Sequence, residues 1–267
     1  MPALFYNYKV GLFLSKQNDK NFFVITIHWL FKLLSLVFNL KMLKNLIRRL
    51  HIIHNLYLKE KVFLNKLSYS QDDTDLEIKK FFLKKDKGFF IDVGCFHPTR
   101  MNNTYLLYKK GWRGINIDLS QFSIDLFNYF RPKDTNIKCA VSDKNGYAKL
   151  YYQKNFSVIS TLKKGLAKER FQGPIKEKIV PTSTLNKIID KSKFKDVPID
   201  FLSIDAEGLD EKILKTFKFK KFMPKLICAE DSVYYRKYTK TNLYKILKPH
   251  GYRHIWSGVV NHLFYIK

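Results

Sequence analysis

Residues 88–118 constrain the fold of this chain more than any other stretch. A short apolar run at 89–91 leads into Asp92 and is followed by a turn at Gly94. A helix-compatible segment comes next, and a second short apolar run ends on Asp118. This order of strand, glycine turn, helix, strand and acid is typical of a nucleotide-binding βαβ unit. Open parallel sheets bind ligands at the carboxyl ends of their strands, where both acids are expected to lie.

The turn after Asp92 indicates the class of ligand by what it lacks. It holds one glycine, Gly94, and therefore lacks the glycine pattern that cradles a pyrophosphate; a P-loop lysine pattern is absent as well. A ligand with an adenosine group and no phosphate fits better, and S-adenosylmethionine is the common one. We expect Gly94 to let the backbone approach the ligand and Asp118 to accept hydrogen bonds from the ribose hydroxyls.

The string IDVGCFHPTRMNNTYLLYKKGWRGINID, residues 91–118, resembles the FkbM family of S-adenosylmethionine-dependent methyltransferases. The resemblance continues from about Ser70 to the end of the chain. Further segments match the family in the same order: Ser70-Gln71 with Asp75, Arg131-Pro132, residues 199–208 and residues 223–231. Cys95, where the family usually has Ala, and Asn102, where it has Ser, are departures that remove no charged group.

The resemblance implies an α/β fold of the Rossmann-like class I methyltransferase type. Such a fold has a mostly parallel seven-stranded sheet closed by an antiparallel C-terminal hairpin. We expect a methyltransferase domain over residues 69–267 and an N-terminal helical extension over residues 1–68, which is a candidate for membrane association. Helices are expected at 75–85, 101–110, 121–130, 209–216 and 241–248, and strands at 135–142, 147–152, 199–204, 225–229, 252–256 and 261–266.

The resemblance also implies a cofactor site at the carboxyl ends of the first strands. Asn103 and Thr104 occupy the family's S-N-T segment, and the loop after the third strand is expected to line the adenine. The residues expected to bind S-adenosylmethionine are Asp92, Gly94, Cys95, Asn103, Thr104, Asp118, Leu119, Ala140, Val141, Ser142 and Asp205.

Acidic residues follow two later apolar runs. Asp205 and Glu207 follow the first, and Glu230 follows the second. Acids brought together at neighbouring strand ends are expected to have raised pKa values or to bind a cation. Methyl transfer to a hydroxyl needs alignment of the acceptor and benefits from a general base or a metal.

We expect these acids to perform the chemistry. Asp205 is predicted to act as the base, or as a metal ligand together with Glu230 if a divalent cation is bound. Glu207 is predicted to orient Asp205, with N-capping of the next helix as the alternative. His97 is a candidate second base, although a hydrogen-bonded loop residue is the favoured interpretation.

The net charge favours an acidic partner. The chain carries 49 Lys and Arg residues against 23 Asp and Glu residues, a formal charge of +26. Nucleic acid, an anionic membrane and acidic glycans all fit such an excess. Only eight of the basic residues are Arg, the side chain that base-reading surfaces favour, so nucleic acid is less well supported. A coding bias toward A-rich codons is the alternative explanation for the lysines.

An apolar run at 22–38 precedes a cluster of basic residues, Lys41, Lys44, Arg48 and Arg49. An interfacial helix on anionic lipid headgroups fits this pattern. A helix packed on the catalytic domain or in a dimer interface fits it as well. A membrane span is the weaker alternative, because the run is short and contains a lysine.

The cysteines and the N-terminus bear on location. Cys95, Cys139 and Cys228 are odd in number and lie in or beside apolar runs, so we expect buried, reduced thiols and no zinc site. The N-terminus lacks the pattern of a cleavable signal peptide. We therefore expect a cytoplasmic protein, peripheral at the membrane if residues 22–50 bind lipid.

Two further segments have alternative interpretations. Residues 153–174 contain Ser160-Thr161-Leu162 and resemble a variable insertion of the family that covers the substrate; a plain surface loop is the alternative. Asp75 is expected to shape the site or to cap a helix.

Together these features predict an O-methyltransferase that acts on a hydroxyl group. FkbM-type relatives methylate sugars, glycolipids and polyketides, so the expected acceptor is a sugar in a glycan or glycolipid. The alternatives are a nucleic-acid methyltransferase, motivated by the charge, and a non-catalytic membrane-associated scaffold with the same fold.

Overall fold

The computed structural model describes residues 36–154, 157, 159–231, 239 and 241–267. The chain divides into two compact units, Met1–Leu58 and Lys59–Lys267. In the first unit, residues 36–53 form an α-helix that continues into the π-helical turn η1 (His54–Lys59). Residues 22–35 of the predicted lipid-binding segment lie outside the described residues. The described part of the chain contains no helix that is long and apolar enough to cross a membrane.

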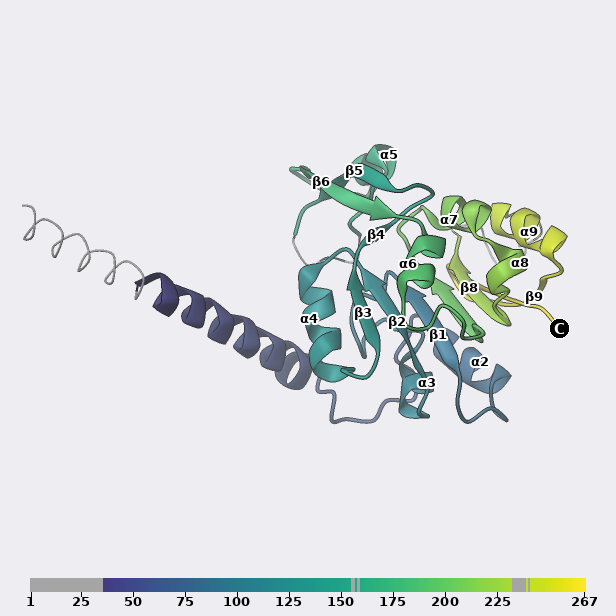
Figure 1. The fold of residues 1–267 in the computed structure, drawn as a ribbon, viewed down its shortest axis with the longest axis horizontal. Helices are drawn as coiled ribbons and strands as arrows, with labels where there is room; N and C mark the ends of the chain where they lie inside the picture. The colour runs from purple at the N-terminus through teal and green to yellow at the C-terminus, as the bar shows by residue number, and fades with distance from the viewer. Residues whose placement is uncertain (1–35, 155–156, 158, 232–238, 240) are drawn as a thin grey trace, which may run out of the picture. The chain divides into compact units, whose positions relative to one another are not determined.

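The second unit is built on a seven-stranded sheet with the order β3-β2-β1-β7-β8-β10-β9 (Figure 1). The strands are β1 (Phe89–Val93), β2 (Arg113–Asp118), β3 (Thr135–Lys138), β7 (Phe201–Ile204), β8 (Leu226–Glu230), β9 (Arg253–Ser257) and β10 (Asn261–Tyr265). The first five pair in parallel, whereas β10 runs antiparallel to both β8 and β9. This topology confirms the predicted class I methyltransferase fold and its closing hairpin.

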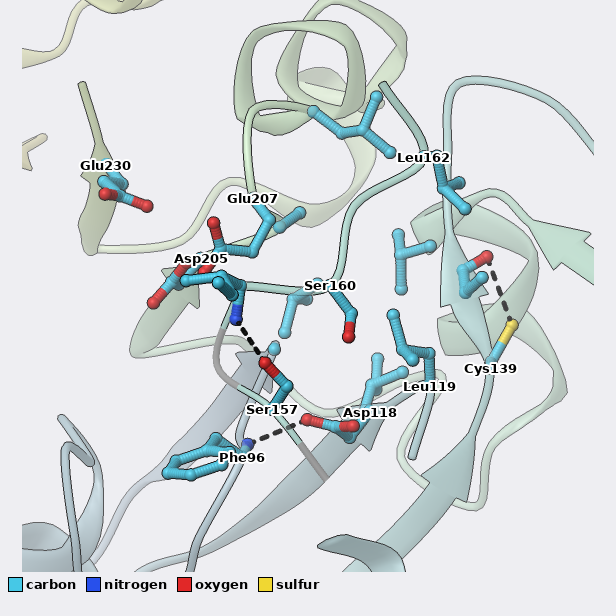
Figure 2. A pocket seen from close by; sticks show the side chains of 18 of the residues that line it. Phe96, Asp118, Leu119, Cys139, Ser157, Ser160, Leu162, Asp205, Glu207 and Glu230 are labelled. Carbon is cyan, nitrogen blue, oxygen red and sulfur yellow. Dashed lines mark hydrogen bonds between the residues drawn. The ribbon is translucent and has the colours of Figure 1, made fainter. Parts of the chain in front are cut away.

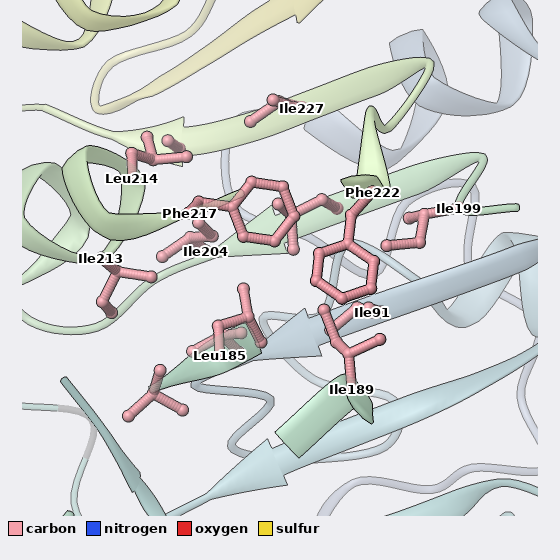
Figure 3. Packing of buried hydrophobic residues seen from close by; sticks show 14 of the residues in the cluster. Ile91, Leu185, Ile189, Ile199, Ile204, Ile213, Leu214, Phe217, Phe222 and Ile227 are labelled. Atoms are coloured by element: carbon pink, nitrogen blue, oxygen red, sulfur yellow. The ribbon is translucent and has the colours of Figure 1, made fainter. Parts of the chain in front are cut away.

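Both faces of this sheet are buried, and β1 shows how. Ile91 belongs to a cluster with residues of the helices on one face (Figure 3), whereas Phe90 packs with residues of the helices on the other face. Four helices cover the first face: α6 (Leu185–Lys191), α7 (Asp210–Thr216), α8 (Phe219–Phe222) and α9 (Asn242–Leu247). Helix α9 runs into the turn η3 (Lys248–His250). Two helices cover the second face: α2 (Thr74–Phe81) and α3 (Tyr105–Lys109). Burial on both faces explains why the strands are continuous apolar runs in the sequence.

Helix α4 (Gln121–Phe130) has the predicted bounds, while α3 begins later than predicted. Ser120 caps α4 by accepting a hydrogen bond from the backbone of Ser123. Met101 has a positive φ of 48°, which a helix does not allow. The side chain of Thr104 bonds to Asp92 rather than capping α3, at 2.8 Å.

A second, three-stranded sheet has the order β4-β6-β5. It consists of β4 (Ala140–Val141), β5 (Gly146–Tyr152) and β6 (Lys176–Ser183), and α5 (Lys164–Arg170) lies beside it. The prediction of one strand over 135–142 is wrong: β3 ends at Lys138, and the chain then leaves the end of β2 to pair with β6. β6 has no counterpart in the prediction, because its side chains are mostly exposed and show no apolar alternation.

Candidate active site

A cavity of about 470 Å³ opens at the carboxyl ends of β1, β2, β7 and β8 (Figure 2). Its volume lies within the range of small-molecule sites. The predicted site residues that line it are Gly94, Asp118, Leu119, Ala140, Val141, Asp205, Glu207 and Glu230. The cavity therefore lies at the sheet edge where the order of strands and acids predicts ligand binding.

Gly94 lines the cavity at a position where the backbone conformation and a close neighbour leave no room for a side chain. It has a positive φ of 77°, and a Cβ atom there would lie 1.8 Å from the carbonyl oxygen of Asp205. The amide of Asp205 donates to the carbonyl of Val93 at 2.9 Å, so β1 and the end of β7 are held close together. Gly94 thus allows the strand ends to approach each other, in addition to the predicted approach of a ligand.

Asp118 forms one end of the cavity. Its Oδ2 accepts a hydrogen bond from the backbone N–H of Phe96 at 2.9 Å, and its Oδ1 accepts one from Ser120 at 2.6 Å. Burial raises the pKa of this carboxyl to about 6, although the two amides oppose the shift. A carboxylate can accept more than two hydrogen bonds and Asp118 lines the cavity, so it can also accept hydrogen bonds from hydroxyls of a ligand.

Acidic side chains form the other end of the cavity. Burial, followed by the charge of Glu230, raises the pKa of Asp205 well above its ordinary value. Burial and Glu230 also raise the pKa of Glu207, to about 7, against the lowering effect of Arg170. Asp210 lies behind this wall, accepts a hydrogen bond from the amide of Glu230 at 3.4 Å, and has a pKa raised by burial to about 7. The folded protein therefore holds protons here at a pH where an unfolded chain would release them.

Asp205 has solvent-exposed surface in the cavity, although burial is the main reason that the pKa of its carboxyl group is raised. Its surface is exposed because it stands on the wall of the cavity, whereas protein atoms surround its carboxyl group on the other sides. The carboxyl group of Glu230 is near enough for its negative charge to contribute to this rise in the pKa of Asp205. Two carboxyl groups in this arrangement are expected to share a proton.

The predicted insertion touches the acidic end of the cavity directly. Arg170, the last residue of α5, forms an ion pair with the carboxylate of Glu207. The hydroxyl of Thr161 donates to the backbone carbonyl of Glu207 at 2.8 Å. Thr161 is anchored in turn by a backbone pairing with Tyr151 in β5. The predicted insertion therefore holds Glu207 at two points, through Thr161 and through Arg170, and Ser160 and Leu162 line the cavity.

His97 lies outside the cavity lining and is buried. Its Nδ1 accepts hydrogen bonds from the backbone N–H groups of Thr99 and Arg100, both at 3.1 Å. Burial and then the charges of Arg100 and Arg131 lower its pKa to about 3. A neutral ring that accepts two backbone bonds matches the favoured interpretation of a loop-forming residue.

Asp92 also lies outside the cavity lining, within a buried polar network. Its Oδ2 accepts hydrogen bonds from Thr104 at 2.8 Å and Asn102 at 3.1 Å. The fully buried Arg131 donates to the hydroxyl of Thr104 and to the side-chain oxygen of Asn102, both at 2.9 Å, and to the carbonyl of Pro98. Arg131 of the Arg-Pro motif thus connects the turn after β1 to the segment before α3.

The remaining predicted cofactor residues have protein partners. Cys95 is buried against Ile124 and Phe127 of α4. The amide of Asn103 donates to the hydroxyl of Ser203 at 3.1 Å. Four of the predicted cofactor residues do not line the cavity: Cys95, Asn103, Thr104 and Ser142. Their contacts with a cofactor stay predictions.

Asp75 holds the turn that precedes α2. It accepts hydrogen bonds from the hydroxyls of Ser68 and Ser70, at 2.6 and 2.9 Å, and from the amide of Tyr69 at 2.8 Å. Gln71, in the same turn, lines the cavity. Asp75 therefore shapes the segment from which Gln71 reaches the site.

The sequence analysis did not identify three residues that contribute to the site: Arg170, Asp210 and Phe96. Arg170 occurs in a lysine-rich stretch, and no local pattern distinguishes it. Asp210 stands in the first turn of a helix, where an acid is ordinarily explained by the helix dipole. Phe96 supplies a backbone amide, which any residue can do.

Among the described residues, no group of three or more His, Cys, Asp or Glu side chains is arranged to hold a metal ion.

Several solved methyltransferase structures are similar to this chain. The TehB-like S-adenosylmethionine-dependent methyltransferase from Corynebacterium glutamicum is 10% identical, with 84% of this chain and 97% of that one covered and a TM-score of 0.39. Precorrin-6y C5,15-methyltransferase from Geobacter metallireducens is 13% identical, with 76% and 92% covered and a TM-score of 0.41. Monomeric WbdD is 11% identical, with 76% and 42% covered and a TM-score of 0.38. No curated protein sequence gives a significant match.

The sequence model of the methyltransferase FkbM domain matches residues 92–254, which is more than half of the chain. The match begins at the end of β1 and includes both ends of the cavity, from Asp118 to Glu230. The chain therefore belongs to the FkbM family and is an S-adenosylmethionine-dependent methyltransferase.

Proposed function

We propose that this enzyme transfers a methyl group to a hydroxyl oxygen of a sugar in a glycan or glycolipid. One observation carries the proposal: Glu207, whose pKa is raised to about 7, lines the same cavity as Asp118. A ribose-binding acid and a proton-accepting acid thus stand at opposite ends of one site. A hydroxyl acceptor needs this pairing more than an already nucleophilic acceptor does.

The residues at the Asp118 end fit the adenosine part of the cofactor. The carboxylate is fixed by two backbone amides and is available to two adjacent ribose hydroxyls. Leu119 and Val141 add apolar surface next to it, which suits the face of an adenine ring. S-adenosylmethionine supplies an activated methyl group when it is bound.

At the acidic end, Glu207 is better suited than Asp205 to accept the proton of the acceptor. A general base works best when its pKa is near the working pH, and the pKa of Glu207 is about 7. Burial and the charge of Glu230 raise the pKa of Asp205 well above its ordinary value, so this carboxyl stays protonated to a higher pH. The sequence-based assignment, with Asp205 as base and Glu207 as orienting partner, is therefore reversed in this proposal.

In the proposed reaction, Glu207 takes the hydroxyl proton as the acceptor oxygen bonds to the methyl carbon and the carbon–sulfur bond breaks. Arg170 and Thr161 keep Glu207 in place during this step. The Asp205–Glu230 pair offers partial negative charge to the positive sulfonium group before transfer. Ser160 lines the same cavity, and its hydroxyl is a candidate hydrogen-bond partner for a sugar hydroxyl.

The cofactor assignment is tested by calorimetry with S-adenosylmethionine on the whole chain. Asp118→Ala removes an acceptor that bonds two hydroxyls, so binding is expected to weaken about 100-fold. Asp190→Ala is the matched control, because Asp190 forms an ion pair with Lys221 on the surface, away from the cavity. Wild-type affinity in Asp118→Ala would remove the ribose assignment.

The acceptor class is tested by following labelled methyl groups into candidate acceptors. Neutral and acidic glycans, glycolipids, RNA and DNA are compared under identical conditions. Methyl incorporation into a glycan hydroxyl supports the proposal. Incorporation into nucleic acid, with a steep dependence on salt, would contradict it in favour of the alternative suggested by the charge.

A further inference from the structure

We propose that the helix of residues 36–50 lies on an anionic lipid surface, with its apolar face among the acyl chains and its basic stripe at the headgroups. The inference concerns the first unit of the chain and does not depend on methyl transfer. It rests on which side chains this helix exposes and on the signs of the charges it carries.

The helix exposes an unusually large amount of apolar surface. Leu36, Leu40, Leu43, Ile47 and Leu50 follow one another at steps of four and three residues, which places them on one face. All five are between 48% and 59% exposed. Apolar side chains exposed as a contiguous stripe mark a site of interaction with a protein or a membrane.

The charged residues of the helix are all basic. Lys41, Lys44 and Arg48 recur at steps of three and four residues and form one exposed stripe beside the apolar face. Residues 36–58 contain no Asp or Glu, and in the sequence no acid occurs between Asp19 and Glu60. A basic stripe flanking an apolar face is the pattern of helices that lie in the interface of anionic membranes.

A second copy of the chain is a poorer occupant of this face. The steps of four and three also suit a coiled coil, but paired coiled-coil helices place complementary charges beside the seam. Here both partners would place lysines there, because no acid is available to pair with them. Phe38 and Met42 lie outside the seam and are 65% and 58% exposed, so a dimer would leave them in water.

The proposal is tested by flotation of the full-length protein with lipid vesicles. One set consists of phosphatidylcholine alone, and a second contains about one third phosphatidylserine, which gives the surface its negative potential. We expect binding to the anionic set, weak binding to the neutral set, and release at high salt. Replacing Lys41, Lys44 and Arg48 by Glu is expected to lower partitioning at least about 100-fold.

Two further variants distinguish binding by this helix from a general attraction of the positively charged protein to anionic lipid. Lys187, Lys191 and Lys193 are exposed on the catalytic unit, and their replacement by Glu changes the net charge by the same amount. This control is expected to keep binding within a few-fold of wild type. Leu43→Asn with Ile47→Asn is expected to abolish binding while all basic residues remain. Thermal unfolding followed by circular dichroism verifies that each variant is folded.

Three outcomes would overturn the proposal. The first is no binding of the wild type to anionic vesicles. The second is equal loss of binding in the control and in the helix variant, which would make net charge the cause. The third is a stable dimer by sedimentation that Leu43→Asn with Ile47→Asn dissociates, without vesicle binding. None of these experiments measures methyl transfer, so a negative result for lipid binding is distinguishable from a negative result for the proposed function.

Discussion

Asp92 and Asp205 stand at the ends of β1 and β7, two neighbouring parallel strands, and their environments differ completely. Asp92 lies below the cavity and accepts hydrogen bonds from Thr104 and Asn102, with Arg131 nearby to offset its charge. Asp205 lines the cavity, and the charges that act on it are negative. Burial raises the pKa of both.

The difference teaches how one sheet edge supports both structure and chemistry. The network around Asp92 is compensated and holds the turn after β1 in shape. Among the described residues, the cluster around Asp205 has one ion pair, between Arg170 and Glu207, so it stores unfavourable charge that a cationic ligand or a proton can relieve. Such clusters are typical of functional sites, whereas compensated networks are typical of structural ones.

Removing the arginine from the compensated network is expected to have the largest effect. Arg131→Met leaves the buried Asp92 without its cation, which typically costs about 3–5 kcal/mol. The free energy of unfolding from urea titration measures this loss. Asp92→Asn is expected to cost less, because Thr104 can still donate to the new side-chain oxygen. A loss below about 1 kcal/mol in Arg131→Met would show that the network contributes little.

The next effect concerns the uncompensated cluster and appears in rate rather than stability. Glu207→Gln cannot accept a proton, so methyl transfer is expected to fall about 10²–10⁴-fold. In the wild type the rate should rise as pH passes about 7, where Glu207 loses its proton, and then level off. The variant should lose this rise. An unchanged pH profile would assign the proton acceptor elsewhere.

Arg170 supplies the control for that profile. Its charge lowers the pKa of Glu207, so Arg170→Ala should move the rise in rate to higher pH, whereas Arg170→Lys should move it less. Lys168→Ala, on the same helix, removes an exposed positive charge of α5 and should leave the profile in place.

The smallest effect is a change in how stability depends on pH. Asp210 has a pKa of about 7 in the folded protein against an ordinary value of 3.8, so its contribution to stability is lost as pH rises from about 4 to 7. Asp210→Asn cannot ionise and still accepts the hydrogen bond from Glu230. The variant should therefore be more stable than wild type at pH 8, by up to about 4 kcal/mol, and show no gain at pH 4. A gain of equal size at both pH values would contradict the assignment.

Much of the fold follows from local sequence. β1 begins with a continuous apolar run, β2 has apolar residues at 115 and 117, and α4 has a capping serine and a clear end, so their positions are predicted within a residue or two. Acids that follow such runs are placed at the ligand-binding edge for the same reason. β6 escaped prediction because it is stabilised by pairing with β5 rather than by burial of its own side chains.

By itself, the sequence determined the fold class and the methyl donor, through the resemblance of its motifs to the FkbM family. It also determined the sheet edge where the acids gather, because apolar runs and the acids that follow them are local features of the chain. Only the tertiary structure decided which acid does what. Burial and the sign of neighbouring charges set each pKa, and those neighbours come from distant segments: Arg131 reaches the Asp92 network, and Arg170 pairs with Glu207. Proximity of this kind is created by folding, and no spacing in the sequence records it.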